Sequence, residues 1–201
     1  RLRQQLKAEG TFLLNVMSSP GSGKTTTLVK TINALSDEFR IGIMEADIDS
    51  DVDARTMSDN TKAKTIQIHT GGMCHLDADM TRQGITELGT DDVDLAILEN
   101  VGNLVCPAEF DTGASKNVMI LSVPEGHDKP LKYPLIFTVC DALLINKIDV
   151  LPYFDFDMDK VTEYAHMRNP DIKIFPICAK TGEGMDAWYE WLRTEVKEWR
   201  S

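Results

Sequence analysis

The sequence of 201 residues has no long hydrophobic run and only four cysteines, and each shortage excludes a class of protein. No apolar stretch approaches the roughly 20 residues that cross a bilayer, and the charged N-terminus at residues 1–9 does not resemble a signal peptide. We therefore expect a cytoplasmic protein without a membrane partner. The cysteines lack the dense spacing of a disulfide framework, so in a reducing compartment they serve packing, metal binding or redox chemistry.

Basic residues are also scarce relative to acidic ones. The chain has 21 Lys and Arg against 32 Asp and Glu, which gives a net charge of −11. A surface that binds nucleic acid needs clustered Lys and Arg to neutralise phosphates, so we expect no nucleic-acid partner. The hydrophobic content of 42% and charged content of 26% are typical of a globular chain rather than a disordered or fibrous one.

Short apolar runs alternate with amphipathic segments of helix length along the chain. The runs lie at 12–17, 41–44, 65–68, 95–98, 118–121, 142–145 and 172–177, and the helical patterns lie at about 24–35, 52–59, 76–88, 131–139, 158–167 and 185–199. This alternation predicts an α/β fold of three layers with a mostly parallel central sheet. The length suits a single domain over residues 11–201, and residues 1–10 indicate an N-terminal helix remnant of a longer chain.

A phosphate-binding P-loop follows the first apolar run and opens a helix, which is the context this motif requires. The candidate nucleotide-binding residues here are Pro20, Gly21, Ser22, Gly23, Lys24, Thr25 and Thr26. The glycines allow a tight turn that points backbone N–H groups at phosphate oxygens. We expect Lys24 to contact the β- and γ-phosphates and the Thr25 hydroxyl to bind magnesium. Ser18 stands where the usual motif has its first glycine, so the match is imperfect.

Acidic residues follow two other apolar runs. Glu99 stands where P-loop enzymes commonly place a magnesium-directed Asp, and Gly102 stands where a switch loop senses the γ-phosphate. The segment 47–53 carries four carboxylates at alternate positions, of which at least two fit a solvated loop with a helix cap. Spacing does not decide which of them serves magnesium, and we favour Asp47 and Asp53. The catalytic candidates are thus Lys24, Asp47, Asp53 and Glu99, and the candidate magnesium ligands are Thr25, Asp47 and Glu99.

A second nucleotide motif, Asn146-Lys147-Ile148-Asp149, directly follows the sixth apolar run. A carboxylate at Asp149 can accept hydrogen bonds from guanine N1–H and the exocyclic amine, which adenine does not present. This favours GTP over ATP. The segment Cys178-Ala179-Lys180, after the last run, completes the base pocket by its position.

Two separated loops carry soft metal ligands. Cys74 and His75 precede a helical pattern, and Cys106 stands beside a proline just after the Glu99 switch. Thiolate and imidazole groups can converge on nickel or zinc, although three ligands need water, another side chain or a second subunit to complete a site. Cys140 and Cys178 border apolar runs and indicate packing. Because Cys106 follows Gly102 by four positions, a moving switch would shift a metal ligand directly.

The quoted segments resemble those of the hydrogenase-maturation nickel-incorporation GTPases, the HypB family, within the dimerising metal-chaperone class of P-loop GTPases. Residues 18–25, 71–78, 99–111 and 146–149 carry this resemblance. It implies a GTP-hydrolysing accessory protein that inserts nickel into the large subunit of a nickel–iron hydrogenase, with a small nickel-binding accessory protein as partner. It also implies a homodimer when GTP is bound, with Cys74, His75 and Cys106 holding nickel or zinc at the dimer interface. The expected cofactors are GTP or GDP, Mg²⁺, and Ni²⁺ or Zn²⁺.

Three alternatives remain open at this stage. A urease-type nickel-insertion GTPase typically places Cys, Pro and His in a single motif, whereas here Cys74-His75 and Cys106-Pro107 are separate. A metal-binding protein would hold nucleotide without productive turnover, and a small-molecule kinase would use the P-loop for phosphoryl transfer. No glutamine or arginine finger can be assigned from the sequence, so we expect slow intrinsic GTP hydrolysis.

Overall fold

A central parallel sheet organises the protein, whose computed structural model describes residues 1–46 and 50–201 and, at residues 50–53, the backbone alone. The strand order is β3-β2-β4-β1-β5-β6-β7, and every described pairing is parallel. The strands are β1 (Phe12–Ser18), β2 (Ile41–Glu45), β3 (Lys64–Gln67), β4 (Leu95–Glu99), β5 (Lys116–Ser122), β6 (Ala142–Asn146) and β7 (Lys173–Pro176). The seven predicted strands and the predicted α/β class are therefore confirmed.

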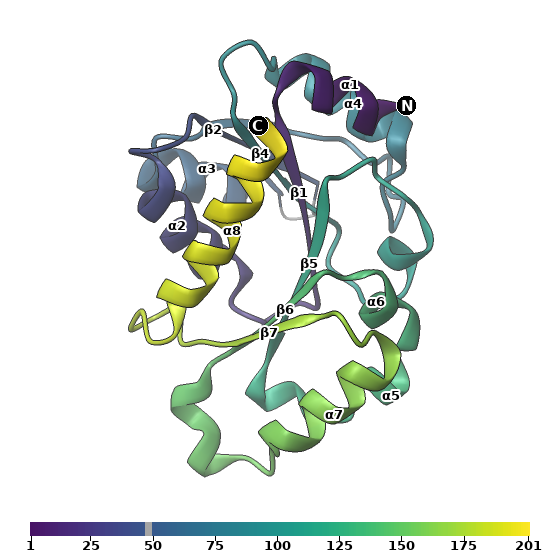
Figure 1. The fold of residues 1–201 in the computed structure, drawn as a ribbon, viewed down its shortest axis with the longest axis vertical. Helices are drawn as coiled ribbons and strands as arrows, with labels where there is room; N and C mark the ends of the chain where they lie inside the picture. The colour runs from purple at the N-terminus through teal and green to yellow at the C-terminus, as the bar shows by residue number, and fades with distance from the viewer. Residues whose placement is uncertain (47–49) are drawn as a thin grey trace.

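Helices cover both faces of the sheet (Figure 1). One face carries α2, α3 and α8, and the other carries α1, α4, α6 and α7. The helices are α1 (Leu2–Glu9), α2 (Lys24–Leu35), α3 (Ser50–Asn60), α4 (Ala78–Leu88), α5 (Lys129–Lys132), α6 (Pro134–Val139), α7 (Met158–Arg168) and α8 (Met185–Arg200), with 3-10 turns η1 (Cys106–Glu109), η2 (Val123–Glu125) and η3 (Ile148–Tyr153). The central strands are buried on both sides, which explains their near-continuous apolar runs.

The helix predicted over 131–139 is interrupted, so that prediction is wrong in one respect. Helix α5 ends at Lys132 and α6 begins at Pro134. Tyr133 between them has φ −126° and ψ 64°, outside the helical region. The residue before a proline is sterically disfavoured in the α conformation, and the proline ring also lacks the N–H that would continue the first helix.

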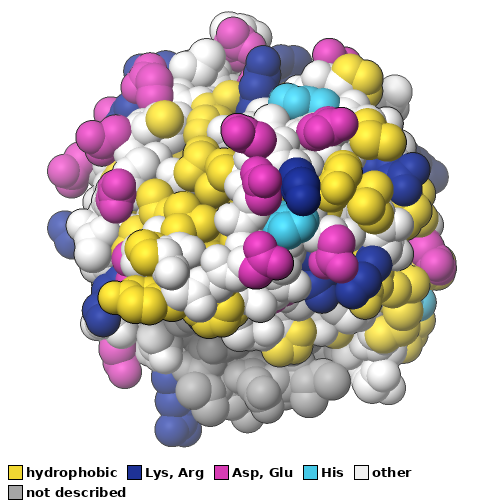
Figure 2. Space-filling model, turned by 90° about the horizontal axis from the view of Figure 1, so that it is seen from below, with side chains coloured by type: hydrophobic (Ala, Val, Ile, Leu, Met, Phe, Trp, Pro, Cys, Tyr) yellow, Lys and Arg dark blue, Asp and Glu magenta, His cyan; other side chains and the backbone are white. Residues whose placement is uncertain are grey.

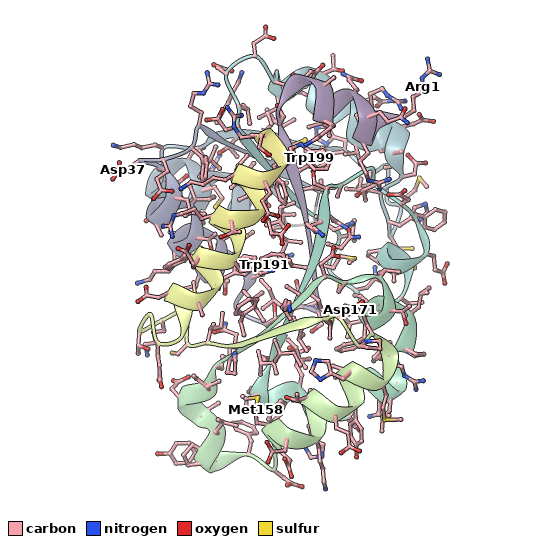
Figure 3. All side chains as sticks on the ribbon, in the orientation of Figure 1. Arg1, Asp37, Met158, Asp171, Trp191 and Trp199 are labelled. Atoms are coloured by element: carbon pink, nitrogen blue, oxygen red, sulfur yellow. The ribbon has the colours of Figure 1, made fainter. Side chains whose placement is uncertain are left out.

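The N-terminal helix packs onto the body of the domain. Leu2 and Leu6 of α1 are buried in a cluster with residues of α4 and of β1, β2 and β4. Trp199, at the end of α8, donates from Nε1 to the carbonyl of Thr11 over 2.8 Å and packs edge-on against Phe12 (Figure 3). Helix α1 and the end of α8 thus both pack near the start of β1. The division into a remnant at 1–10 and a domain at 11–201 stays a prediction.

The surface carries charges of both signs. On the face seen in Figure 2, Lys and Arg side chains are scattered among acidic and hydrophobic ones instead of forming one basic patch. Among the described helices, none combines the length and the apolar character that a bilayer crossing requires.

Trp188 joins α8 to α2, the helix that begins at the P-loop. Its side chain is 1% exposed, and Nε1 donates to Thr31 Oγ1 over 2.9 Å. We predict that Trp188→Ala lowers the free energy of unfolding by about 3–5 kcal/mol, because it leaves a cavity and removes this bond. Denaturant titration followed by circular dichroism measures the change. Met167→Ala, at a side chain 63% exposed, serves as control and should stay within about 0.5 kcal/mol of the wild type. Equal losses in both variants would contradict the prediction.

Candidate functional site

The P-loop turns tightly between β1 and α2. Gly21 and Gly23 have φ of 81° and 85°, in the left-handed region that favours glycine. A Cβ atom at Gly23 would lie 2.2 Å from Asn146 Nδ2, so a larger residue cannot fit there without moving that side chain. The loop therefore needs glycine both for its backbone conformation and for its close approach to the segment after β6. Its backbone leads into the N-terminus of α2, where the helix dipole favours phosphate.

A buried ion pair links the P-loop to the end of β4. Lys24 Nζ lies 2.9 Å from Glu99 Oε1, with side chains 10% and 0% exposed. Apart from this contact with Lys24, no described residue donates a hydrogen bond to the Glu99 carboxylate. A buried carboxylate with unused lone pairs fits a hard cation such as magnesium as a further partner. The structure thus places two of the candidate catalytic residues, Lys24 and Glu99, in contact, and their roles in catalysis stay predictions.

Glu45 is a second buried carboxylate that the sequence interpretation missed. It ends β2 directly opposite Glu99 in the parallel register, and its side chain is 0% exposed. A charged residue at the very end of an apolar run was the signal in the sequence. Of the other acidic candidates, Asp47 lies outside the described residues, and Asp53 lies in α3 with its side chain outside the description. Their predicted roles at magnesium stay predictions.

A small cavity of about 190 Å³ lies beside the P-loop helix, where the base pocket was predicted. Its lining includes Gly23, Thr26, Asn146, Lys147, Asp149, Cys178, Ala179 and Lys180. Asn146 donates to the Ser22 carbonyl over 2.9 Å and accepts from the Ala179 N–H over 3.0 Å, so one amide joins three loops. Lys147 Nζ donates to the Gly21 carbonyl over 2.7 Å. The exposed Asp149 carboxylate stands at the rim, where it can accept hydrogen bonds from a base.

Glu125 also contacts the P-loop, through a hydrogen bond that no local motif indicated. Its carboxylate accepts from the Ser122 N–H at 2.7 Å and from Ser122 Oγ at 2.8 Å, which caps η2. The hydroxyl of Ser19 donates to the other carboxylate oxygen. The segment after β5 thereby holds the start of the P-loop, and Asn146 at the end of the next strand, β6, holds its end.

The two cysteine loops meet on the face of the sheet that carries α4 and α6. Cys74 is exposed and Cys106 is half-buried, and Cys106 begins η1 instead of lying in an irregular loop. Hydrogen bonding with the nearby Cys74 thiol is the main cause that raises the pKa of the Cys106 thiol above its usual value. Cys74 Sγ and His75 Nδ1 are 3.9 Å apart. A thiol with a raised pKa is protonated at neutral pH, so a metal ion binding there displaces a proton.

The described residues contain no group of three Cys, His, Asp or Glu side chains already arranged around a metal position. The ring of His75 stacks on Phe110 with centroids 3.7 Å and planes 9° apart. The thiols of Cys74 and Cys106 are soft donors that suit nickel or zinc, and further ligands are needed to complete the coordination. Cys140 and Cys178 are both 1% exposed, and burial raises the pKa of Cys140, which confirms packing for these two.

Known proteins match the chain over most of its length. The family model described as CobW/HypB/UreG, nucleotide-binding domain, matches residues 12–176. The hydrogenase maturation factor HypB of Azotobacter chroococcum mcd 1 is 46% identical over 193 residues, which are 96% of this chain and 63% of that protein. The chain thus spans less than two thirds of this relative.

Two solved structures share the fold at substantial identity. HypB from Archaeoglobus fulgidus has a TM-score of 0.89 at 37% identity, and the match covers 97% of this chain and 95% of that one. HypB from Helicobacter pylori in complex with nickel has a TM-score of 0.89 at 36% identity, covering 98% and 92%. The matches thus extend over nearly all of the chain that carries the nucleotide motifs and the cysteine loops. The chain therefore belongs to the CobW/HypB/UreG family of nucleotide-binding proteins, and within it to the HypB branch.

Proposed function

We propose that this chain hydrolyses GTP slowly and uses the nucleotide cycle to control nickel delivery for the maturation of a nickel–iron hydrogenase. One observation carries the proposal: a single short segment begins at Glu99, which pairs with the P-loop lysine, and reaches Cys106. Within that segment, Asn103 hydrogen-bonds to the backbone of both Cys106 and Cys74. Only a few residues therefore separate the nucleotide site from a candidate metal ligand, so a backbone shift at Glu99 would also displace Cys106. The names of the HypB relatives support hydrogenase maturation, and the Helicobacter pylori HypB structure in complex with nickel supports that metal.

Some of the nucleotide-binding residues bind the phosphates and others bind the base. Lys24 and the backbone N–H groups of the Gly21–Gly23 turn bind the phosphates, and Asp149 selects guanine through its carboxylate. Thr25, Glu99 and an acidic residue of 47–53 would hold magnesium, which would neutralise charge on the phosphate oxygens. Because Lys24 leaves Glu99 partly for the phosphates, the ion pair weakens when GTP binds. The segment after Glu99 then changes position.

The metal site is completed between two subunits in this proposal. Cys74, His75 and Cys106 supply fewer ligands than a closed tetrahedral site needs, and the same three groups from a second copy would supply the rest. We infer that GTP favours a homodimer and that hydrolysis reverses its closure. A small nickel-binding accessory protein and the large subunit of the hydrogenase are the proposed donor or acceptor partners. Zinc is the competing metal, and the cytoplasmic location stays a prediction.

The alternatives differ in measurable ways. A urease-type function would require delivery to another acceptor enzyme, although the separate cysteine loops favour the hydrogenase branch. A metal-binding protein with a merely structural nucleotide would show no turnover. A small-molecule kinase would transfer phosphate to an acceptor other than water.

Removal of the P-loop lysine tests turnover. We predict that Lys24→Ala lowers multiple-turnover phosphate release from GTP by at least about 100-fold, because the charge that stabilises the transferring phosphoryl group is lost. Lys30→Ala, at a lysine further along the same helix, is the matched control and should keep the wild-type rate. Turnover that persists at the wild-type rate in Lys24→Ala would contradict a role of this lysine in hydrolysis, and absent turnover in the wild type would favour the structural-nucleotide alternative.

Base selection depends on Asp149. We predict that Asp149→Asn weakens GTP binding about 10–100-fold, since a charged hydrogen bond contributes about 1.5–3 kcal/mol. The same change should favour xanthosine triphosphate, because the asparagine amide can donate to the 2-oxo group of xanthine. Fluorescent-nucleotide competition measures both affinities, with Asp155→Asn at a nearby exposed position as control. Unchanged GTP affinity in Asp149→Asn would place base recognition elsewhere.

Nickel binding is expected to need Cys106 and to respond to nucleotide. We predict that Cys106→Ala weakens nickel binding by at least about 100-fold, because loss of a ligand costs more than loss of a supporting contact. Equilibrium titration with GDP and with a non-hydrolysable GTP analogue, while the oligomeric state is recorded, measures this. Cys140→Ala removes a buried thiol outside the site and should bind nickel like the wild type. Nickel binding that ignores both Cys106 and the nucleotide would refute switch-coupled delivery.

A further inference from the structure

One side chain ties the two cysteine loops together. Asn103 donates from Nδ2 to the carbonyl oxygen of Cys74 over 2.9 Å, between segments 29 positions apart in the sequence. Its Oδ1 accepts from the backbone N–H groups of Val105 at 3.0 Å and Cys106 at 2.8 Å. A side-chain amide has both donors and an acceptor, so Asn103 connects the backbone of one cysteine to the backbone of the other.

A second contact joins the same two segments a few residues further on. The ring of Phe110, which follows η1, stacks on the ring of His75 with centroids 3.7 Å apart. Phe110 is 39% exposed, so this stacking is not imposed by a surrounding core. The segment after the switch therefore touches both residues of the Cys74–His75 pair, one through the Asn103 amide and one through the Phe110 ring.

The start of the switch is anchored to the sheet by another asparagine. Asn100 accepts from the Val101 N–H at Oδ1 over 2.8 Å and donates to Asn15 Oδ1 over 3.0 Å. Asn15 in turn donates to Asn117 Oδ1 over 3.0 Å, so the amides link the end of β4 to β1 and β5. Only Val101 and Gly102 separate the sheet anchor at Asn100 from Asn103. Gly102 therefore lies between two hydrogen-bonded asparagines, and its backbone can adopt conformations that other residues resist.

We propose that Asn103 is a positioning residue that makes the Cys74 and Cys106 loops move as one unit when the Gly102 segment changes position. This inference rests on the proposed nickel function. With the Asn103 bonds intact, displacement of the switch carries both thiols, so the metal-binding pair responds as a whole. Without the bond to Cys74, the Cys74 loop can readjust to the metal independently, and nucleotide no longer changes nickel affinity.

The test uses Asn103→Asp and Asn103→Ala in the full chain. Asp keeps the acceptor for Val105 and Cys106 and loses only the donor to Cys74, whereas Ala loses both. Asn33→Asp is the matched control, because Asn33 Nδ2 donates to the carbonyl of Asn60 over 3.1 Å and thus joins two other segments in the same way. The first readout needs no metal: the rate at which diamide oxidises Cys74 and Cys106 to an intramolecular disulfide, identified by peptide mapping.

We expect Asn103→Asp and Asn103→Ala to slow this disulfide formation by about three- to tenfold, the effect of losing one ordinary hydrogen bond, and Asn33→Asp to leave it unchanged. The second readout is the ratio of nickel dissociation constants with GDP and with a GTP analogue, which should approach one in Asn103→Asp. Wild-type disulfide rates in both Asn103 variants would overturn the inference, as would an unchanged nucleotide ratio. If the wild type fails to bind nickel through Cys106, the proposed function fails, while the metal-free rates still decide whether Asn103 joins the loops.

Discussion

The parallel register of β2, β4 and β1 is the constraint on which the whole site depends. It sets Glu99 opposite Glu45 on one side and opposite Val16 on the other. Since the P-loop begins just after β1 and the switch just after β4, this register brings Lys24 within 2.9 Å of Glu99. A shift of one residue would turn the Glu99 side chain to the other face of the sheet. Phosphate binding and the switch are therefore coupled by strand pairing before any nucleotide is considered.

The buried ion pair is stable only because both charges are present. Glu99 is fully buried, and removal of a partner from such a pair typically costs about 3–5 kcal/mol because one charge is left uncompensated in a medium of low polarity. Phosphate and magnesium can replace the partners, since one is an anion for Lys24 and the other a cation for Glu99. In the proposed nucleotide cycle the site would exchange one set of charge contacts for another, which is a physical basis for a switch.

Asparagine amides connect segments that are far apart in the sequence. Asn146 joins the P-loop to the segment after β7, and Asn103 joins the two cysteine loops. Asn100 and Asn15 do the same inside the sheet. An uncharged amide can donate and accept at once. It can therefore form hydrogen bonds with backbone groups of two segments without the desolvation cost of an ion. The described site thus has an ion pair between the P-loop and β4 and side-chain amides where loops are held together.

Patterns along the chain were enough to predict the strands, the P-loop, the base motif and the family, because these depend on periodicity and on residues within a few positions of each other. The break between α5 and α6 is also a local effect, because Pro134 disfavours a helical conformation at the residue before it. Only the folded structure shows that Glu45 lies opposite Glu99 in the strand register. It also shows that Asn103 hydrogen-bonds to the Cys74 carbonyl and that the Phe110 ring stacks on His75. These contacts join segments whose separation in space is set by the packing of helices on the sheet. No local pattern specifies such a distance, because it is the sum of many contacts made elsewhere.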